Sequence, residues 1–299
     1  MLYLTVISII VALFFLTRLF FIKREIKRVT NQLTQVNRFQ TDKKIDHTFF
    51  EKDLEKLASE INQQMDITMQ AYAEKRRTEN ELKQAIANIS HDIRTPMTSI
   101  LGYIQFLESD DLSIGQRNEY MAIVKNGALR LKVLLEDFFE LSIIESTDYP
   151  LKIESIKLNQ LIPEVLVGFY EAFHQRGLEP ILQLPEGEIT IKADSSAVKR
   201  VLENLLSNAI KHSAGNVTIR LEKRQSSVQL TIRNPAGQLT EKDLFLFFDR
   251  FYKADKTRTG KGTGLGLSIA KSLMKKMNGN LTAELQGDQL MMKCEWRGK

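Results

Sequence analysis

The stretch Arg200–Ser213, which reads RVLENLLSNAIKHS, decides the fold of this chain because it predicts one helix with two chemically different faces. On one face Asn204, Asn208 and Lys211 follow at intervals of four and three residues. Amide oxygens suit a hard ion such as Mg²⁺, and an ammonium group suits phosphate oxygens. A merely solvated polar face has the same spacing. The other face is aliphatic and predicts packing in a core: Leu202, Leu206, Ile210.

Around this helix, from Glu154 to Cys294, short β-type runs alternate with helical ones. The helical runs are Leu158–Phe173, Ser195–His212 and Leu267–Met277. The predicted strands are Ile189–Lys192, Val217–Lys223, Val228–Arg233, Asn280–Leu285 and Leu290–Trp296. Mostly antiparallel strands with helices grouped on one side predict a separate α+β domain of about 150 residues.

A glycine-rich segment, Gly260–Leu267 (GKGTGLGL), leads into the last helical run. Dense glycines let backbone N–H groups approach an anion, and a helix N-terminus adds partial positive charge. The segment is neither a Walker loop nor a dinucleotide fingerprint, because it lacks Gly-Lys-Ser/Thr and a preceding strand. The interleaved Leu265 and Leu267 argue against a simple flexible turn.

An aromatic segment, Phe247–Lys253 (FFDRFYK), stands just ahead of the basic segment Lys256–Lys261. It is either an aromatic anchor for a surface loop or the base of a mobile, positively charged lid over phosphates. The residues themselves leave both interpretations open.

A fourth motif, Ser90–Pro96 (SHDIRTP), belongs to an earlier helical block. His91 lies two positions from the apolar Ile89 and Ile93, roughly 200° around the helix, so we expect it to face water. A lone surface histidine is normally inert. The adjacent Asp92 can fix the tautomer of the imidazole and accept its proton, which makes a nucleophile.

A second helical block is expected to resume at Leu82 and to carry one amphipathic stripe through this motif, and a second stripe follows the Glu108–Leu112 connector. Ser113 and Gln116 have capping-box spacing for the second helix, whereas Pro96 predicts a kink in the first. A lone helix hairpin cannot bury both stripes, so we expect a dimer that forms a four-helix bundle. The stripes are Leu82, Ile86, Ile89, Ile93, Met97, Ile100 and Tyr120, Ile123, Gly127, Leu131, Leu134, Phe138, Leu141.

In their order along the chain, the four motifs resemble those of the sensor histidine kinases of two-component systems, from Glu79 to the C-terminus. Ser90–Pro96 resembles the phosphoacceptor H box, Asn204–Ser213 the N box, Phe247–Lys253 the F box and Gly260–Leu267 the G2 box. The resemblance implies a dimerisation and phosphotransfer bundle over residues 79–148. It also implies, over residues 149–299, the ATP-binding sandwich shared with gyrase, heat-shock chaperones and mismatch-repair ATPases.

The resemblance further implies ATP and Mg²⁺, and a phosphoryl group that passes from His91 to an aspartate of a response regulator. Asp92 is the expected base, and Asn204 and Asn208 are the expected Mg²⁺ ligands. Thr95 is expected to orient water in a phosphatase reaction; alternatively it bonds a carbonyl one turn back and helps the kink. The expected nucleotide residues are Asn204, Asn208, Lys211, His212, Asn234, Arg250, Lys253, Gly262, Thr263, Gly264, Leu265 and Gly266.

One motif departs from the family pattern. Where the family has Asp-x-Gly-x-Gly, with the Asp accepting from the adenine amino group, this chain reads NPAGQ over Asn234–Gln238. An amide oxygen accepts that hydrogen bond without the strength of a carboxylate. A membrane scaffold or phosphatase with a decayed nucleotide site is therefore an alternative. A gyrase-type ATPase would need a Glu in place of Asn204 and would not explain His91.

The N-terminal stretch Leu2–Ile22 has 21 residues with one charge, Arg18. At 1.5 Å per residue it spans a hydrocarbon core of about 30 Å. The basic flank Lys23–Arg28 predicts cytoplasmic catalytic parts and a single-pass anchor in the cell membrane, with almost nothing outside. A cleaved signal peptide fits less well because no positive n-region or cleavage site is visible. The signal is then expected through the bilayer, a membrane partner protein or the cytoplasmic rod.

Residues 23–78 are charged and contain no proline or glycine, and apolar residues are spaced by three or four. This predicts a helical rod with a connector over Asp42–Phe50. The rod is either a solvated spacer or a conveyor of helix movement, which periodicity cannot distinguish.

Length and composition agree with an α+β multidomain chain. Its 299 residues leave room for about two domains. The net charge of +5 is too small to indicate nucleic acid binding. A single cysteine, Cys294, excludes an internal disulfide.

Overall fold

The computed structural model describes residues 2–37, 52–109, 111–236, 239–253 and 262–297. The chain separates into two compact units, Met1–Gln84 and Ala85–Lys299. Helix α2 (Lys52–Leu107) contributes to both units.

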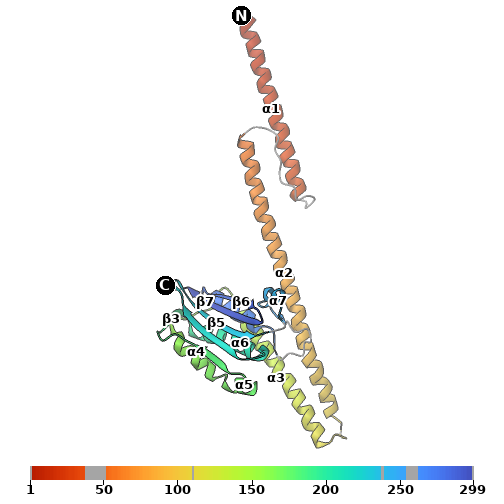
Figure 1. The fold of residues 1–299 in the computed structure, drawn as a ribbon. Helices are drawn as coiled ribbons and strands as arrows, with labels where there is room; N and C mark the ends of the chain where they lie inside the picture. Colours follow the sequence, from red (N-terminus) through yellow and green to blue (C-terminus); the bar gives the residue numbers. More distant parts are fainter. Residues whose placement is uncertain (1, 38–51, 110, 237–238, 254–261, 298–299) are drawn as a thin grey trace. The chain divides into compact units, whose positions relative to one another are not determined.

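The first unit contains helix α1 (Leu2–Asn37) and the beginning of α2 (Figure 1). Helix α1 continues without a break past Ile22, where the apolar stretch ends, into the basic flank. Its segment Tyr3–Thr34 is long and apolar enough to cross a membrane, a criterion that an N-terminal signal sequence also meets. The connector expected over Asp42–Phe50 lies outside the described residues.

Helix α2 is one helix, and the predicted second start at Leu82 is wrong. The segment before Pro96 contains neither glycine nor proline, so nothing in it favours an end to the helix. The helix also continues through Pro96, whose ring removes one backbone donor. The Thr95 hydroxyl donates to the His91 carbonyl oxygen at 3.1 Å.

Helix α3 (Ile114–Glu145) returns alongside α2 and forms the expected hairpin (Figure 1). The predicted capping box is confirmed, because Gln116 N–H donates to Ser113 Oγ at 3.3 Å and Ser113 N–H to Gln116 Oε1 at 3.1 Å. The helices approach closely at Gly127, where a Cβ would lie 2.9 Å from Ile100 Cγ1. Much of the apolar surface of the hairpin stays exposed, including Met97, Leu101, Ile104, Phe106, Met121, Leu129, Val133 and Phe139.

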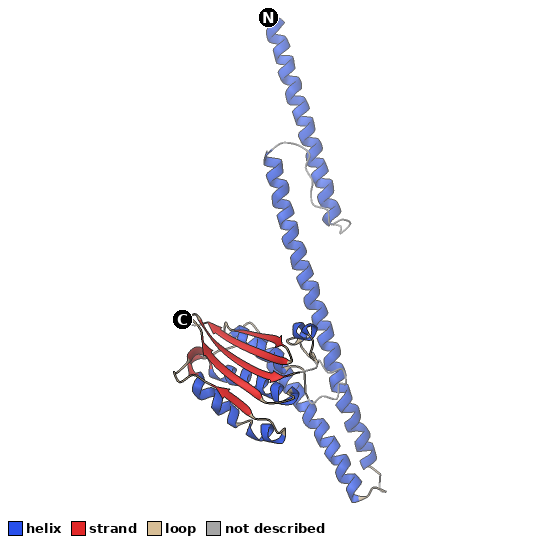
Figure 2. Ribbon diagram, in the orientation of Figure 1, coloured by secondary structure: helices blue, strands red, loops and turns tan. Residues whose placement is uncertain are grey.

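The C-terminal part of the second unit is a sandwich of a sheet and helices (Figure 2). The five-stranded sheet has the order β2-β4-β5-β7-β6, antiparallel except for the parallel pair β2–β4. Strand β1 (Ile153–Lys157) pairs separately with β3 (Thr190–Asp194). The strands of the large sheet are β2 (Pro180–Gln183), β4 (Val217–Lys223), β5 (Ser227–Pro235), β6 (Asn280–Gln286) and β7 (Gln289–Arg297).

Helices cover one face of the large sheet (Figure 2). In β7 the side chains alternate, and those facing the helices are buried: Leu290, Met292, Cys294 and Trp296. This period of two is the signature of a strand with one face in a core. The helices of this domain are α4 (Leu158–Val167), α5 (Tyr170–Gln175), α6 (Ser195–His212), α7 (Glu241–Leu246) and α8 (Gly266–Lys276).

The predicted mixture of antiparallel strands with helices on one side is confirmed, and β4 and α6 have the predicted bounds. The helix expected over Leu158–Phe173 is divided at Gly168 and Phe169. The sequence patterns missed β1, β2 and α7. Strands β1 and β2 are mostly exposed and α7 has only six residues, so none of them displays a clear hydrophobic period.

Candidate functional site

Helix α6 presents the amide and ammonium groups expected from its sequence. Its N-terminus is capped by Asp194, whose Oδ1 accepts from Ala197 N–H at 2.9 Å. Asn204 and Asn208 are half-buried, and the C-terminal Lys211 and His212 are exposed. The two amides and the lysine therefore share a face that leads out of the core toward solvent.

Two glycines of the glycine-rich segment are required by close approaches. At Gly266, where α8 begins, a Cβ would lie 2.9 Å from Asn204 Oδ1 on α6. At Gly264, with φ +73°, a Cβ would lie 2.9 Å from the Phe251 backbone. Gly262 has open space around it, Leu265 is fully buried, and Gly260 and Lys261 lie outside the described residues.

The aromatic segment is hydrogen-bonded to the glycine-rich segment. Phe251 N–H donates to the Gly264 carbonyl oxygen at 2.9 Å, and Phe251 is buried with φ +64°. Tyr252 O–H donates to Asp243 Oδ1 at 2.6 Å. Burial and this hydrogen bond raise the pKa of Tyr252 to about 12. The described segments that end at Lys253 and begin at Gly262 are thus joined by the hydrogen bond between Phe251 and Gly264.

Asn234 lies at the end of β5 and is 1 % exposed. Its Nδ2 donates to the Pro235 carbonyl oxygen at 3.2 Å. Because the Asn234 nitrogen donates within the chain, the side-chain oxygen is the atom suited to accept a hydrogen bond from a ligand. Gly237 and Gln238, which complete this motif, lie outside the described part of the chain.

The exposed imidazole of His91 faces a carboxylate, as the sequence predicted. His91 Nδ1 lies 3.3 Å from Asp92 Oδ1. The other carboxylate oxygen, Asp92 Oδ2, accepts from Lys253 Nζ at 2.6 Å. Burial acts to raise the pKa of Asp92, but the hydrogen bonds from Lys253 and His91 outweigh it, and the pKa is lowered. Asp92 therefore stands between the histidine motif and the aromatic motif.

A second set of contacts, which the sequence patterns did not reveal, joins α3 to the sandwich. Arg200 Nε donates to Glu140 Oε1 at 2.9 Å, and its Nη2 lies 3.1 Å from Asp137 Oδ1. Thr263 Oγ1 donates to Asp137 Oδ2 at 2.7 Å. Arg250 Nη2 pairs with Glu145 Oε2 at 2.6 Å. The sequence did contain an indication of these contacts. The three carboxylates lie on one helix, and Arg200 and Arg250 lie in the stretches Arg200–Ser213 and Phe247–Lys253 that carry the recognised motifs.

The surroundings shift the pKa values of two basic groups, Lys211 and Arg200. Desolvation lowers the pKa of Lys211, and the Asp137 carboxylate partly opposes it. The hydrogen bond to Glu140 raises the pKa of Arg200. In the described residues no group of three His, Cys, Asp or Glu side chains gathers to hold a metal. A magnesium ion beside Asn204 and Asn208 would thus need further ligands from phosphates or water.

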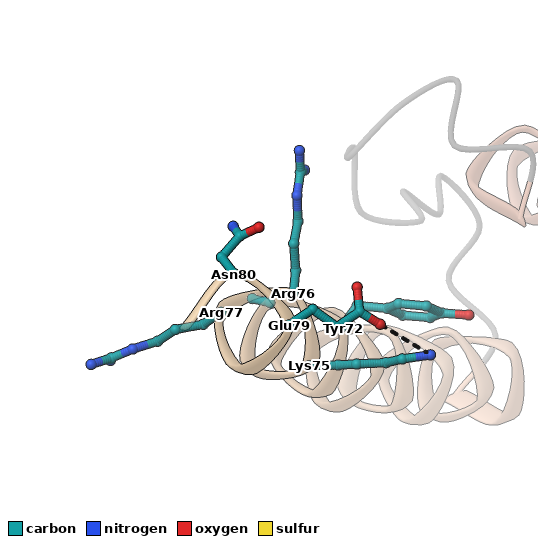
Figure 3. Close-up of a pocket in the computed structure, with 7 residues that line it drawn as sticks. Tyr72, Lys75, Arg76, Arg77, Glu79 and Asn80 are labelled. Atoms are coloured by element: carbon teal, nitrogen blue, oxygen red, sulfur yellow. Dashed lines mark ion pairs between the residues drawn. The ribbon is translucent and has the colours of Figure 1, made fainter. Parts of the chain in front are cut away.

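A hollow on α2 lies outside this site (Figure 3). Residues of a single helix line it, and Figure 3 shows Arg76 and Arg77 extending away from the helix. Lys75 Nζ lies 3.9 Å from Glu79 Oε1 in an exposed i,i+4 ion pair. A hollow open on one helix encloses no ligand, so it receives no role.

Two family models match the chain. Residues 81–147 match the His Kinase A (phospho-acceptor) domain. Residues 193–294 match the histidine kinase-, DNA gyrase B- and HSP90-like ATPase domain. The first contains His91, and the second contains α6 and the glycine-rich segment.

Curated relatives are sensor proteins. Sensor histidine kinase YcbM of Bacillus subtilis is 29% identical over 77% of this chain and 76% of its own length. Sensor protein VanSC of Enterococcus gallinarum is 30% identical over 78% of this chain and 65% of its own length. Sensor histidine kinase WalK of Bacillus subtilis is 30% identical, but the chain spans only 36% of WalK.

Solved structures share the fold. Histidine kinase AdeS of Acinetobacter baumannii has a TM-score of 0.57 and 24% identity, covering 69% of this chain and 97% of its own. Histidine kinase ThkA, solved with the response regulator protein TrrA, has a TM-score of 0.62 and 23% identity, covering 77% of this chain and 66% of its own.

Proposed function

The chain belongs to the sensor histidine kinases of bacterial two-component systems, and we propose that it transfers the γ-phosphoryl group of ATP to His91 and from there to an aspartate of a response regulator. The observation that carries this proposal is the chain of contacts from His91 through Asp92 to Lys253. It links the acceptor histidine to the segment that adjoins the nucleotide residues. Sequence separation makes the link informative, since Lys253 follows Asp92 by 161 residues.

Nucleotide binding is assigned to the residues around α6 and the glycine-rich segment. Asn208 and Asn204 are the proposed Mg²⁺ ligands through their side-chain oxygens. The buried Asn204 Nδ2 has no hydrogen-bond partner in the described parts of the chain, and this donor suits a phosphate oxygen. When bound, Mg²⁺ would neutralise charge that develops on the phosphates. Asn234 is assigned to adenine. The phosphates are assigned to Lys211, His212, Arg250, Lys253 and the segment Gly262–Gly266.

Asp92 prepares His91 for attack. With Asp92 beside Nδ1, the imidazole proton is held on Nδ1, and the lone pair is on Nε2. A bond forms between His91 Nε2 and the γ-phosphorus, and the bond to the bridging oxygen of ADP breaks. The positive charge that develops on the imidazole is stabilised by Asp92, which has a lowered pKa and is thus ionised at neutral pH.

Dimerisation and membrane attachment are part of the proposal. The hairpin leaves large apolar side chains exposed on both helices, such as Leu101 at 56% and Phe139 at 60%. A second copy of the hairpin would bury them in a four-helix bundle. The apolar part of α1 is proposed as the single cell-membrane anchor, with the catalytic parts in the cytoplasm. A membrane partner protein is one source of the signal.

The proposed phosphatase role belongs to Thr95. Its hydroxyl is exposed and donates to the His91 carbonyl oxygen, one turn back. A hydroxyl also accepts hydrogen bonds, so it can orient a water molecule against the phosphoaspartate of the regulator. The intrahelical bond equally supports a purely structural role.

The acceptor is tested by replacing it. We expect His91→Gln to abolish acid-labile labelling from γ-labelled ATP while ATP affinity is unchanged, because Gln has no nucleophilic imidazole. His174→Gln is the matched control, since His174 is exposed on α5 and stacked on Tyr170. It should label like the parent. If the His91→Gln variant is still labelled, the phosphoryl acceptor is a residue other than His91.

A scaffold or phosphatase with a weakened nucleotide site is the second candidate. It is favoured by Asn234, a buried amide where the family pattern has an aspartate. The direct ATP affinity of the parent chain distinguishes the two candidates, because a kinase must bind ATP at cellular concentrations.

A further inference from the structure

Asp137 of α3 lies where the hairpin meets the residues assigned to nucleotide. Its Oδ2 accepts from Thr263 Oγ1 at 2.7 Å, and its Oδ1 lies 3.1 Å from Arg200 Nη2. Its side chain is only 15% exposed. Its charge also acts on Lys211. One carboxylate thus hydrogen-bonds Thr263 and acts electrostatically on Lys211, two groups that the proposed function gives to ATP.

The neighbouring carboxylates of α3 differ from Asp137. Glu136 is 62% exposed and pairs with Lys132 on its own helix at 3.6 Å. Glu140 holds Arg200 through both of its oxygens, at 2.9 and 3.0 Å from Nε. In the described part of the chain neither of them bonds the glycine-rich segment, whereas Asp137 bonds Thr263. Of these three acids, Asp137 is therefore the one that bonds the glycine-rich segment.

A carboxylate and a phosphate compete for the same donors. Both are oxyanions that accept charge-assisted hydrogen bonds from hydroxyl and ammonium groups. Two anions a few ångströms apart in a partly buried place also repel each other more strongly than they would in water. ATP phosphates that approach Lys211 and Thr263 therefore compete with Asp137 for hydrogen-bond donors and are also repelled by its negative charge.

We propose that Asp137 is a built-in competitor of the ATP phosphates, so that nucleotide binding and the docking of α3 on the sandwich oppose each other. The inference rests on the proposed function, which assigns Thr263 and Lys211 to nucleotide. By linkage, ATP loosens the Asp137 contacts by the same factor by which those contacts weaken ATP binding. The hairpin that carries His91 is then freed when substrate is present.

The test is the affinity of the full chain for ATP in the presence of Mg²⁺, measured by calorimetric titration. Asp137→Asn keeps the shape of the side chain and an acceptor for Thr263 but removes the charge. We expect ATP affinity to rise about fivefold or more. Glu136→Gln removes one charge from the adjacent, outward-facing position and should leave the affinity unchanged.

A second variant distinguishes competition between Asp137 and the ATP phosphates from steric blocking of the nucleotide site by the hairpin. Glu140→Gln weakens the contact with Arg200 and leaves Asp137 in place. Direct competition requires a clearly smaller effect in Glu140→Gln than in Asp137→Asn. Equal effects would overturn the proposal in favour of steric blocking. An unchanged affinity in Asp137→Asn, with normal binding by the parent, would overturn this inference alone. A parent that binds no ATP would overturn the proposed function together with it.

Discussion

At the scale of single residues, Asp92 shows how one carboxylate serves two partners. Its oxygens are divided between His91 and Lys253, which reach it from different domains of one unit. Because its pKa is lowered in the fold, its contribution to stability is present above the pKa of the unfolded chain. That contribution is lost as the pH falls through the lower pKa of the folded state. The ionised form needed beside the imidazole is therefore the form that the fold favours at neutral pH.

Thr95 provides the residue-scale prediction. We expect Thr95→Ala to leave His91 labelling largely intact and to prolong the lifetime of the phosphorylated regulator about tenfold or more, because the water loses its orienting hydroxyl. The measurement is the decay of labelled regulator on addition of each protein.

Thr98→Ala is the control, since Thr98 is an exposed threonine of the same helix, three residues further on. It should dephosphorylate the regulator at the parent rate. Equal rates for the parent and Thr95→Ala would leave Thr95 only the bond to the His91 carbonyl oxygen.

At the scale of elements, a clasp between Phe251 and Gly264 joins the aromatic and glycine-rich segments. Phe251 adopts φ +64°, a left-handed conformation that costs a non-glycine residue about 1–3 kcal/mol. The buried ring and the 2.9 Å hydrogen bond to Gly264 offset this cost. A Cβ on Gly264 would lie 2.9 Å from the Phe251 backbone, so the two segments are closely packed at this point.

The clasp gives the element-scale prediction. We expect Gly264→Ala to lower the free energy of unfolding of the ATP-binding domain by more than about 2 kcal/mol and to weaken ATP binding. Alanine at φ +73° carries the left-handed penalty of about 1–2 kcal/mol, and its Cβ would collide with the Phe251 backbone. Chemical denaturation monitored by circular dichroism measures the change.

Gly287→Ala separates these two causes. Gly287 has φ +64° in the turn between β6 and β7, and a Cβ there meets nothing within 4 Å. It should show the left-handed penalty alone and keep ATP binding. Similar losses in both variants would mean that the contact with Phe251 contributes nothing.

At the scale of the whole molecule, the catalytic chemistry and the apolar helix belong to different compact units. The unit Ala85–Lys299 contains the proposed acceptor, the nucleotide residues and the contacts between them. The other unit contains α1, whose apolar residues are exposed over most of their length. Catalysis should therefore need only the second unit, whereas regulation needs both.

The whole-molecule prediction follows from this division. A shortened chain that begins near Thr78 should autophosphorylate at a rate close to that of the full chain, because its catalytic unit is intact. In cells it should no longer regulate its target genes in response to the native stimulus. A reporter fused to such a gene measures this loss, with the full chain as control. A response that persists would place sensing in the remaining part of the chain, outside α1.

The sequence by itself determined the long elements and the chemical groups of the site. The faces of α6 and of β7 repeat with periods that local sequence displays, and the capping box at Ser113 needs only four adjacent residues. Neighbouring residues likewise brought His91 to an exposed face beside Asp92. These features depend on interactions within a few residues, so a local pattern is sufficient to reveal them.

Only the tertiary structure decided which distant groups meet. Thr263 and Asp137 are 126 residues apart, and nothing local to either selects the other from the many acids and hydroxyls of the chain. The short strands β1 and β2 also form through their partners β3 and β4 rather than through their own composition. In each case the stabilising contact exists only after the main elements have packed, because packing alone brings the two groups within bonding distance.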